Sequence, residues 1–410
     1  MPQTQELQTV RTETRRMLAL AAINAAICVA CVAIPMFVIR PFRPQGAQAL
    51  AIALTVRRAG PWLAGVCAAV VLLLLVRSWK TMKIGARTAM AGLLLVAIAC
   101  AIFTHINIFE KMFHPYGSSS FVSVAEAKVD PDDKVLAVIL GQEARAYPIR
   151  TMGYHHIVND TVNGVPIAVT YCTLCHTGLV WNRVVEGRLL HFRLAGINNG
   201  NALLRDEETS SIWQQSTGEA IFGPLKGKQL QLVRSNELSF ALWSKEQPQG
   251  LVLKPNSLYA SEYDPKDWEK HVEKTRTVVD TTKSGIGPHQ LMVGITLAGE
   301  NKAYPVQAIV AAKLIQDHVG KVPVLLLVGP DGASIRIFEV SQDGENTLRT
   351  FSIGPRDGTM NDIETGSIWN FQGCAVEGQM SGQCLKEIDG HKDYWFDWMN
   401  HHPDSSVFKS

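Results

Sequence analysis

Asp206-Glu207-Glu208-Thr209-Ser210-Ser211-Ile212-Trp213 returns later in the chain as Asp362-Ile363-Glu364-Thr365-Gly366-Ser367-Ile368-Trp369. Further matches follow in the same order at a nearly constant offset: Ala146-Tyr147-Pro148-Ile149 returns as Ala303-Tyr304-Pro305-Val306, and Val165-Pro166-Ile167 as Val322-Pro323-Val324. A period this long indicates a duplicated domain rather than an array of short repeats. We therefore expect two related halves in the polar part of the chain.

These matches divide the chain into four parts. Residues 1–116 are apolar, 117–254 form the first repeat, 255–289 a charged connector, and 290–410 a second, degenerate repeat. Alternating runs such as Lys134–Leu140 and Ala144–Tyr147 predict β-hairpins. Short helices are expected at Ile149–Val158, Glu237–Lys245, Val306–Asp317 and Tyr394–Asn400. The predicted fold is a mainly β (β-rich α+β) duplicated soluble domain, a pseudo-two-fold pair of sheets or barrels, plus an N-terminal bundle of about three transmembrane helices.

Three N-terminal segments are apolar enough to span a bilayer. They are Met17–Ile39, Pro61–Val76 and Thr88–Thr104, and crossing the hydrocarbon core takes about 20 residues. The weaker stretch Ala47–Val56 is expected to lie at the interface or against its neighbours. The first span could be a cleaved signal peptide, but two more spans follow it, which favours an uncleaved anchor in the lipid bilayer.

Charge sets limits on partners and orientation. The formal net charge of +2 excludes the strongly basic face that nucleic-acid binding requires. Lys and Arg are mildly more frequent on the side that holds the N-terminus, which favours a soluble domain outside the cell (inner) membrane, periplasmic or extracellular. The physiological partner, a small molecule or a protein, is undefined at this stage, as is enzymatic activity.

The eight cysteines fall into two groups. Cys28, Cys31, Cys67 and Cys100 lie in the apolar segments, where Cys usually acts as a small packing residue, so we expect no chemistry from them. Cys374 and Cys384 bracket a short turn and are expected to form a disulfide if the domain is exported.

A feature present in both halves is expected to be scaffold, as for the Asp-x-Glu-Thr-x-Ser-Ile-Trp element, whereas a feature of one half is a candidate for function. Only the first half carries Cys172, Cys175 and His176, which are replaced by Gly329, Gly332 and Ala333 in the second. It also carries His155 and His156 where the second half has Ala312 and Lys313. Thiolates and imidazoles are ligands of copper and zinc, so these five residues predict a metal site, with copper favoured.

Other functions fit the same residues. The Cys-x-x-Cys pair could be a redox disulfide or two packed thiols without chemistry, and Cys-x-x-Cys-His is also the spelling of a haem c attachment site. In the alternative from a different class, the duplicated domain is a binding or assembly module with structural cysteines. His401-His402 near the C-terminus is interpreted as surface.

The chain also resembles a known family, domain of unknown function 3179. The resemblance rests on Gly141–Pro148, on Ile157-Val158-Asn159-Asp160 after the two histidines, on Val169–Cys175, and on Asp206–Trp213 with the segments that follow. It implies a bacterial or archaeal protein that is exported or attached to a membrane, and it points to Cys172, Cys175 and His155 or His156. The family commonly has Gly after the second Cys, where this chain has His176.

Overall fold

The computed structural model describes the backbone of all residues except 1, 118, 343–344 and 410, and the side chains of those residues apart from 2–7, 341–342 and 345–348. The chain forms two compact units. One consists of Met1–Met112 with Gly196–Asn198, and the other of Phe113–Ala195 with Asn199–Ser410. Apart from Gly196–Asn198, both repeats and the connector between them therefore belong to a single compact unit.

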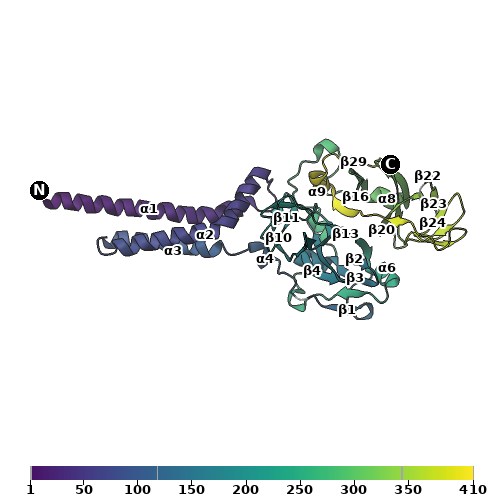
Figure 1. Ribbon diagram of the computed structural model, residues 1–410, viewed down its shortest axis with the longest axis horizontal. Helices are drawn as coiled ribbons and strands as arrows, with labels where there is room; N and C mark the ends of the chain where they lie inside the picture. Colours follow the sequence, from purple (N-terminus) through teal and green to yellow (C-terminus); the bar gives the residue numbers. More distant parts are fainter. Residues whose placement is uncertain (1, 118, 343–344, 410) are drawn as a thin grey trace. The chain divides into compact units, whose positions relative to one another are not determined.

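Three long helices make up most of the first unit. They are α1 (Pro2–Val38), α2 (Ala47–Ser78) and α3 (Ile84–Phe103), and short α4 (Ile108–Met112) follows (Figure 1). Each contains a stretch long and apolar enough to cross a bilayer, which confirms the predicted anchor. Residues 47–56, which we expected at the interface or against their neighbours, form the first turns of α2, and Leu50, Ala53 and Leu54 among them are buried. Pro61 lies inside this helix without ending it, as is tolerated in membrane helices whose neighbours satisfy the freed backbone group.

The first repeat folds into three main sheets with strand orders β1-β15-β3-β2-β14, β13-β6-β5-β4 and β12-β11-β10-β9. Pairing is antiparallel except between β15 and β3. The strands are β1 (Phe121–Ser123), β2 (Lys134–Leu140), β3 (Glu143–Pro148), β4 (Ile157–Val162), β5 (Val165–Cys172), β6 (Thr177–Asn182), β7 (Val184–Val185), β8 (Arg188–Leu189), β9 (Phe192–Asn198), β10 (Asn201–Asp206), β11 (Ile212–Gln214), β12 (Ala220–Phe222), β13 (Leu232–Val233), β14 (Asn236–Ser239) and β15 (Leu251–Leu253).

The second repeat has three sheets of matching order, β28-β16-β17-β29, β18-β19-β20-β27 and β23-β24-β25-β26. Its strands are β16 (Leu291–Leu297), β17 (Glu300–Pro305), β18 (Leu314–Val319), β19 (Val322–Val328), β20 (Ile335–Glu339), β21 (Ser341–Gln342), β22 (Glu345–Leu348), β23 (Phe351–Ile353), β24 (Met360–Asp362), β25 (Ile368–Trp369), β26 (Ala375–Glu377), β27 (Lys386–Glu387), β28 (His391–Tyr394) and β29 (Ser406–Val407). The predicted mainly β fold is confirmed.

Short helices occupy corresponding places in the two repeats: α5 (Ile149–His155) and α6 (Phe240–Glu246) in the first, α8 (Val306–Ala312) and α9 (Trp395–His401) in the second. The connector adds α7 (Trp268–Val272), and single 3₁₀ turns lie at Val124–Glu126, Ser257–Tyr259 and Thr282–Ser284. We predicted α5 and α8 too long at their C-termini. Each ends at a residue with positive φ, His156 at 62° and Lys313 at 60°, which turns the chain into the next strand.

The C-terminal strand and helix of each repeat stay in their own repeat, where β14 pairs with β2 and β28 with β16, and they also contact the other repeat. In one contact, α6 and β14 of the first repeat pack on β19, β20 and β24 of the second. The centre of this contact is apolar, since Leu238, Leu242, Leu327, Phe338 and Met360 are all buried in one cluster. A buried ion pair between Glu246 of α6 and Arg336 of β20 lies in the same contact. In the corresponding contact, β28 and α9 of the second repeat meet the turn between β5 and β6 of the first, and the backbone N–H of Tyr394 donates to the carbonyl of Cys175 at 2.8 Å.

Candidate functional site

The second of these contacts is polar at the positions where the centre of the first is apolar. By position in strand and helix, Asp393 of β28 and Asp397 of α9 correspond to Leu238 of β14 and Leu242 of α6. Both aspartates are buried, with 1% and 0% exposure. Because burying a carboxyl group is costly unless it is paired or hydrogen-bonded, this replacement of two core leucines marks the contact as a site rather than a core.

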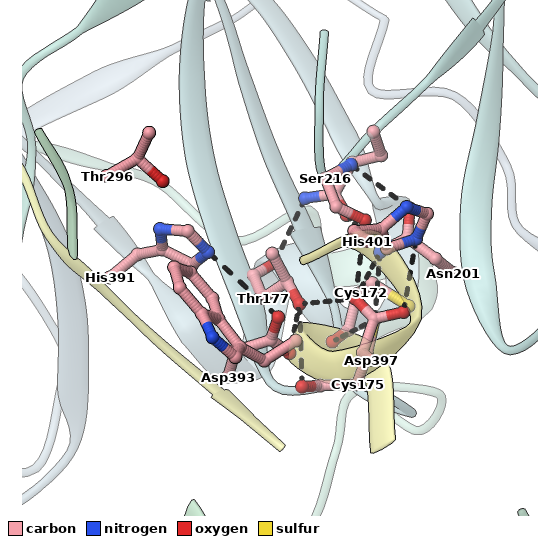
Figure 2. Close-up of polar contacts among 12 residues, drawn as sticks. Cys172, Cys175, Thr177, Asn201, Ser216, Thr296, His391, Asp393, Asp397 and His401 are labelled. Carbon is pink, nitrogen blue, oxygen red and sulfur yellow. Dashed lines mark hydrogen bonds and ion pairs between the residues drawn. The ribbon is translucent and has the colours of Figure 1, made fainter. Parts of the chain in front are cut away.

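Two thiols form one side of the site (Figure 2). Cys172 ends β5 and Cys175 lies in the turn before β6; both are buried and neither is in a disulfide. The Cys172 Sγ lies 3.6 Å from the carbonyl oxygen of Gly200. Burial, a hydrogen bond with the Cys172 side chain and the charge of Asp397 raise the pKa of Cys175 well above its usual range. Cys175 therefore keeps its proton at neutral pH in the reduced protein.

The two carboxyl groups face the thiols and share a hydroxyl group. The Thr177 Oγ1 lies 2.8 Å from Asp393 Oδ1 and 3.3 Å from Asp397 Oδ2. Burial and the charge of Asp397 raise the pKa of Asp393 well above its usual range. A protonated Asp393 can donate to Thr177, which leaves the single hydroxyl proton of Thr177 for Asp397. The pair thus holds one proton beside the thiols.

Asn201, the first residue of β10, connects the two sides. Its Nδ2 lies 3.2 Å from the Sγ of Cys175 and 2.9 Å from the Oδ2 of Asp397. Its Oδ1 accepts from the side chain of Gln214 at 2.6 Å and from the backbone N–H of Ser216 at 3.1 Å. Asn201 is fully buried, so it fixes a thiol and a carboxylate from different repeats at one point.

A cavity of about 270 Å³ lies between the repeats next to this network. Ser216 lines it and also donates to Asp397 at 3.3 Å. Two imidazoles line the cavity from the second repeat: burial and neighbouring histidines lower the pKa of both His391 and His402 to about 4. These rings are neutral at physiological pH, and the Nε2 of His391 lies 4.0 Å from Asp393 Oδ2. The carboxyl group of Asp389 lines the same cavity.

The structure places His176 outside the thiol–carboxyl network. Its Nδ1 lies 3.2 Å from the Tyr171 hydroxyl and its Nε2 2.7 Å from Glu269 Oε1. Although burial opposes the shift, the hydrogen bond from His176 and the charge of Lys134 lower the pKa of Glu269 to about 2. The φ of His176 is 61°, a left-handed angle that glycine adopts without strain.

The other two predicted histidines also have protein partners. The Nδ1 of His155 lies 2.6 Å from the carbonyl of His114 and its Nε2 3.2 Å from the Tyr263 hydroxyl. The Nδ1 of His156 lies 3.1 Å from the carbonyl of Tyr154, and burial lowers its pKa to about 4. Of the five predicted ligands, the structure thus brings together only Cys172 and Cys175. Among the described residues, no three His, Cys, Asp or Glu side chains are arranged to hold a metal ion.

Sequence reasoning missed the residues that the second repeat contributes. Asp393 and Asp397 were not singled out, although aligning α9 with α6 would have shown them replacing leucines. His401-His402 was interpreted as surface, which is wrong: the His401 side chain is only 11% exposed and its Nε2 lies 3.5 Å from Asp397 Oδ1.

Two further expectations concern structural elements: the duplicated Asp-x-Glu-Thr-x-Ser-Ile-Trp sequence and the pair Cys374 and Cys384. Asp206 accepts from the backbone of Thr209 and Ser211 and from the indole of Trp213, and Asp362 accepts from Thr365 in the second repeat. This pattern fits the structural role expected for the duplicated element. Cys374 and Cys384 form a disulfide at the place where Glu219 and Gln229 pair in the first repeat.

Fold and site together define a membrane-anchored, duplicated β protein with a buried dithiol beside two carboxyl groups. The family described as "Protein of unknown function (DUF3179)" matches residues 117–405, and the chain belongs to it. No curated protein and no solved structure matches the chain.

Proposed function

We propose that this domain is a dithiol–disulfide redox protein in which Cys172 and Cys175 cycle between two thiols and a disulfide. The observation that carries the proposal is the contrast between the two repeat contacts. At the positions that correspond to Asp393 and Asp397, the first contact holds two leucines in an apolar cluster. The other contact holds two unbridged thiols, a carboxyl pair that keeps a proton, and an amide that joins them. A thiol–disulfide couple needs a group that takes up and returns protons.

The proposed reaction exchanges the dithiol with a low-molecular-weight disulfide. The Cys172 thiolate attacks one sulfur of that disulfide, forming a mixed disulfide and releasing one thiol. Cys175 then attacks the Cys172 Sγ, which forms the Cys172–Cys175 bond and releases the second thiol. Two thiol protons leave the protein and two appear on the products. The carboxylate of Asp397 accepts the Cys175 proton, and Asn201 stabilises the developing thiolate by donating to its sulfur.

The burial of both sulfurs supports a small substrate rather than a protein. Cys172 is 2% exposed and Cys175 is fully buried, so a folded partner could not reach them without opening the contact between repeats. The cavity beside Ser216 and His391 offers a small molecule room next to the network, and neither thiol is among the residues that line it. A disulfide at Cys374–Cys384 supports, in addition, a soluble domain on the oxidising, extracytoplasmic side of the membrane.

The test is a redox titration of the full-length protein in detergent. In a background with the four membrane cysteines changed to Ala, the protein is equilibrated in buffers of graded reduced and oxidised glutathione and its free thiols are counted with a maleimide. We expect two thiols to appear together in one two-electron transition.

Matched variants identify the pair. Cys172→Ser and Cys175→Ser should each remove the transition, and the Cys374→Ser/Cys384→Ser variant should retain it. Thiols that stay reduced at every buffer composition would refute the proposal.

Copper binding by the same two thiols is the second candidate. The observation in its favour is that the three histidines have other partners, so the ligand set reduces to two cysteines, and soft thiolates select Cu(I), whereas structural zinc takes four ligands. Elemental analysis of protein purified without chelator distinguishes the two functions. Stoichiometric copper that is lost in Cys172→Ser/Cys175→Ser supports the metal site, and a Soret band in the same sample would indicate haem.

A further inference from the structure

Six exposed cations gather at one end of the helical unit. Three of them lie on α1 just before its apolar part, and three lie at the end of α2 and in the turn to α3. Met17 and Leu18 of α1 pack against the cluster that contains Met82 of this turn, so the two groups of cations lie at the same end of the unit. Together they form the basic cluster, which consists of Arg11, Arg15, Arg16, Arg77, Lys80 and Lys83.

The charge of the basic cluster is not balanced by the protein around it. Among the residues whose side chains the structure describes, no carboxylate pairs with any of the six cations. The sequence between residues 8 and 87 contains a single acidic residue, Glu13. Cations at the other end of the unit differ, because the guanidinium groups of Arg40 and Arg43 lie 4.5 and 4.9 Å from the centre of the Phe37 ring. The basic cluster therefore presents charges that can bind an anion from outside the protein.

Two tryptophans of α2 mark where the helical unit leaves the hydrocarbon core of a bilayer. Trp62 is 82% exposed and Trp79 is 48% exposed. Seventeen residues separate them, which at 1.5 Å per residue is about 26 Å, close to the roughly 30 Å of a hydrocarbon core. Exposed tryptophans concentrate at the two membrane–water interfaces. The guanidinium of Arg87 lies 5.2 Å from the centre of the Trp79 ring, so the boundary at Trp79 is the one beside the basic cluster.

We propose that the basic cluster binds the headgroups of anionic phospholipids. Groups of about four to eight Lys and Arg next to a membrane helix are attracted to anionic lipid surfaces, and guanidinium and ammonium groups donate strong hydrogen bonds to phosphate oxygens. The location favours a lipid, because headgroups lie at the level of the cations, whereas a soluble acidic partner would have to be brought there. The inference uses residues of the helical unit alone and does not depend on the function proposed for Cys172 and Cys175.

The experiment measures how strongly brominated lipids quench the fluorescence of Trp79. Full-length protein is reconstituted in vesicles with phosphatidylcholine in fourfold excess over phosphatidylglycerol. In one preparation the phosphatidylglycerol is brominated, and in the other an equal amount of phosphatidylcholine is. The contribution of Trp79 is the difference between the parent and Trp79→Phe. We expect brominated phosphatidylglycerol to quench Trp79 at least twofold more strongly than brominated phosphatidylcholine does. Trp62, measured in the same way with Trp62→Phe, is the matched control and should give a ratio near one.

Charge variants connect the lipid preference to the basic cluster. Arg15→Gln/Lys80→Gln/Lys83→Gln should bring the quenching ratio at Trp79 close to one, while quenching by brominated phosphatidylcholine stays at the parent level and shows that the helices are still inserted. Arg40→Gln/Arg43→Gln/Arg58→Gln removes the same number of charges from the other end and should keep the parent ratio. Equal quenching of Trp79 by the two lipids in the parent would overturn the proposal. So would a preference that survives in the first variant, because it would not arise from these cations.

Discussion

Asn201→Ala should destabilise the soluble domain more than any exposed polar substitution, because Asn201 satisfies groups from both repeats. Its removal takes the acceptor from the backbone N–H of Ser216, one hydrogen bond from Gln214, and the donor at 2.9 Å from each of Asp397 and Gln215. A buried polar group left unsatisfied costs about 1–3 kcal/mol, so the loss sums to roughly 3–5 kcal/mol. For a domain of this size, that lowers Tm on the order of 10 °C.

The assay is thermal unfolding of the full-length protein in detergent, followed by tryptophan fluorescence. Asn182→Ala is the matched control, because Asn182 accepts a single hydrogen bond, from the backbone of Val184 at 2.8 Å, and should cost about 1 kcal/mol. Asn201→Ala should also alter the rate at which Cys175 is alkylated, since it removes the amide that donates to this sulfur. Equal Tm values for Asn201→Ala and the control would refute the hydrogen-bond network as described.

Three further predictions concern stability. Glu246→Gln breaks the pair with Arg336, whose side chains are 6% and 4% exposed. Arg336 keeps Glu387 at 3.5 Å, so the change should cost about 1.5–3 kcal/mol, the contribution of hydrogen bonds to a charged group. It is measured by denaturant unfolding, and a loss below about 1 kcal/mol would contradict it. The pKa of Asp393 in the folded protein lies above its ordinary value of 3.8, so between these two pKa values the folded state binds more protons than the unfolded state. As pH rises through this range, the free energy of unfolding of the parent should therefore fall, by up to about 1.4 kcal/mol per pH unit. Asp393→Asn should lack this slope, and identical pH profiles would exclude the raised pKa. Cys374→Ser/Cys384→Ser opens a disulfide with a sequence separation of 10 and should cost about 2–3 kcal/mol, seen as a lower Tm that dithiothreitol reproduces in the parent.

Much of the architecture could be predicted from the sequence because periodic patterns report local geometry. The apolar spans and the alternating strands of the duplicated halves are of this kind. Helix ends were less accurate, since His156 and Lys313 adopt positive φ without being glycine. The candidate site was half predicted. Cys172 and Cys175 were found from their absence in the second repeat, but their neighbours Asp393 and Asp397 lie more than two hundred positions away, and no local pattern brings α9 to the β5–β6 turn.

The three histidines proposed as ligands have other hydrogen-bond partners for a related reason. Proximity along the chain suggested that His155, His156 and His176 would surround the thiols. A buried imidazole, however, forms hydrogen bonds with the groups that the fold places beside it. For His176 these are Tyr171 and Glu269, and for His155 they are His114 and Tyr263. Residue type therefore indicated the chemistry that is possible, while the packing decided which groups meet.

The two corresponding contacts, each made by the C-terminal strand and helix of one repeat with the other repeat, have a consequence for how such a protein could arise. A single-copy ancestor would have needed a second molecule to cover each of its open faces, and the resulting symmetrical dimer would have carried two identical contacts. Once the two copies were fused into one chain, the two contacts no longer had to have the same sequence. One could then hold the repeats together through apolar packing, and the other could acquire reactive groups. In this protein the first carries Leu238 and Leu242, and the second carries Asp393 and Asp397.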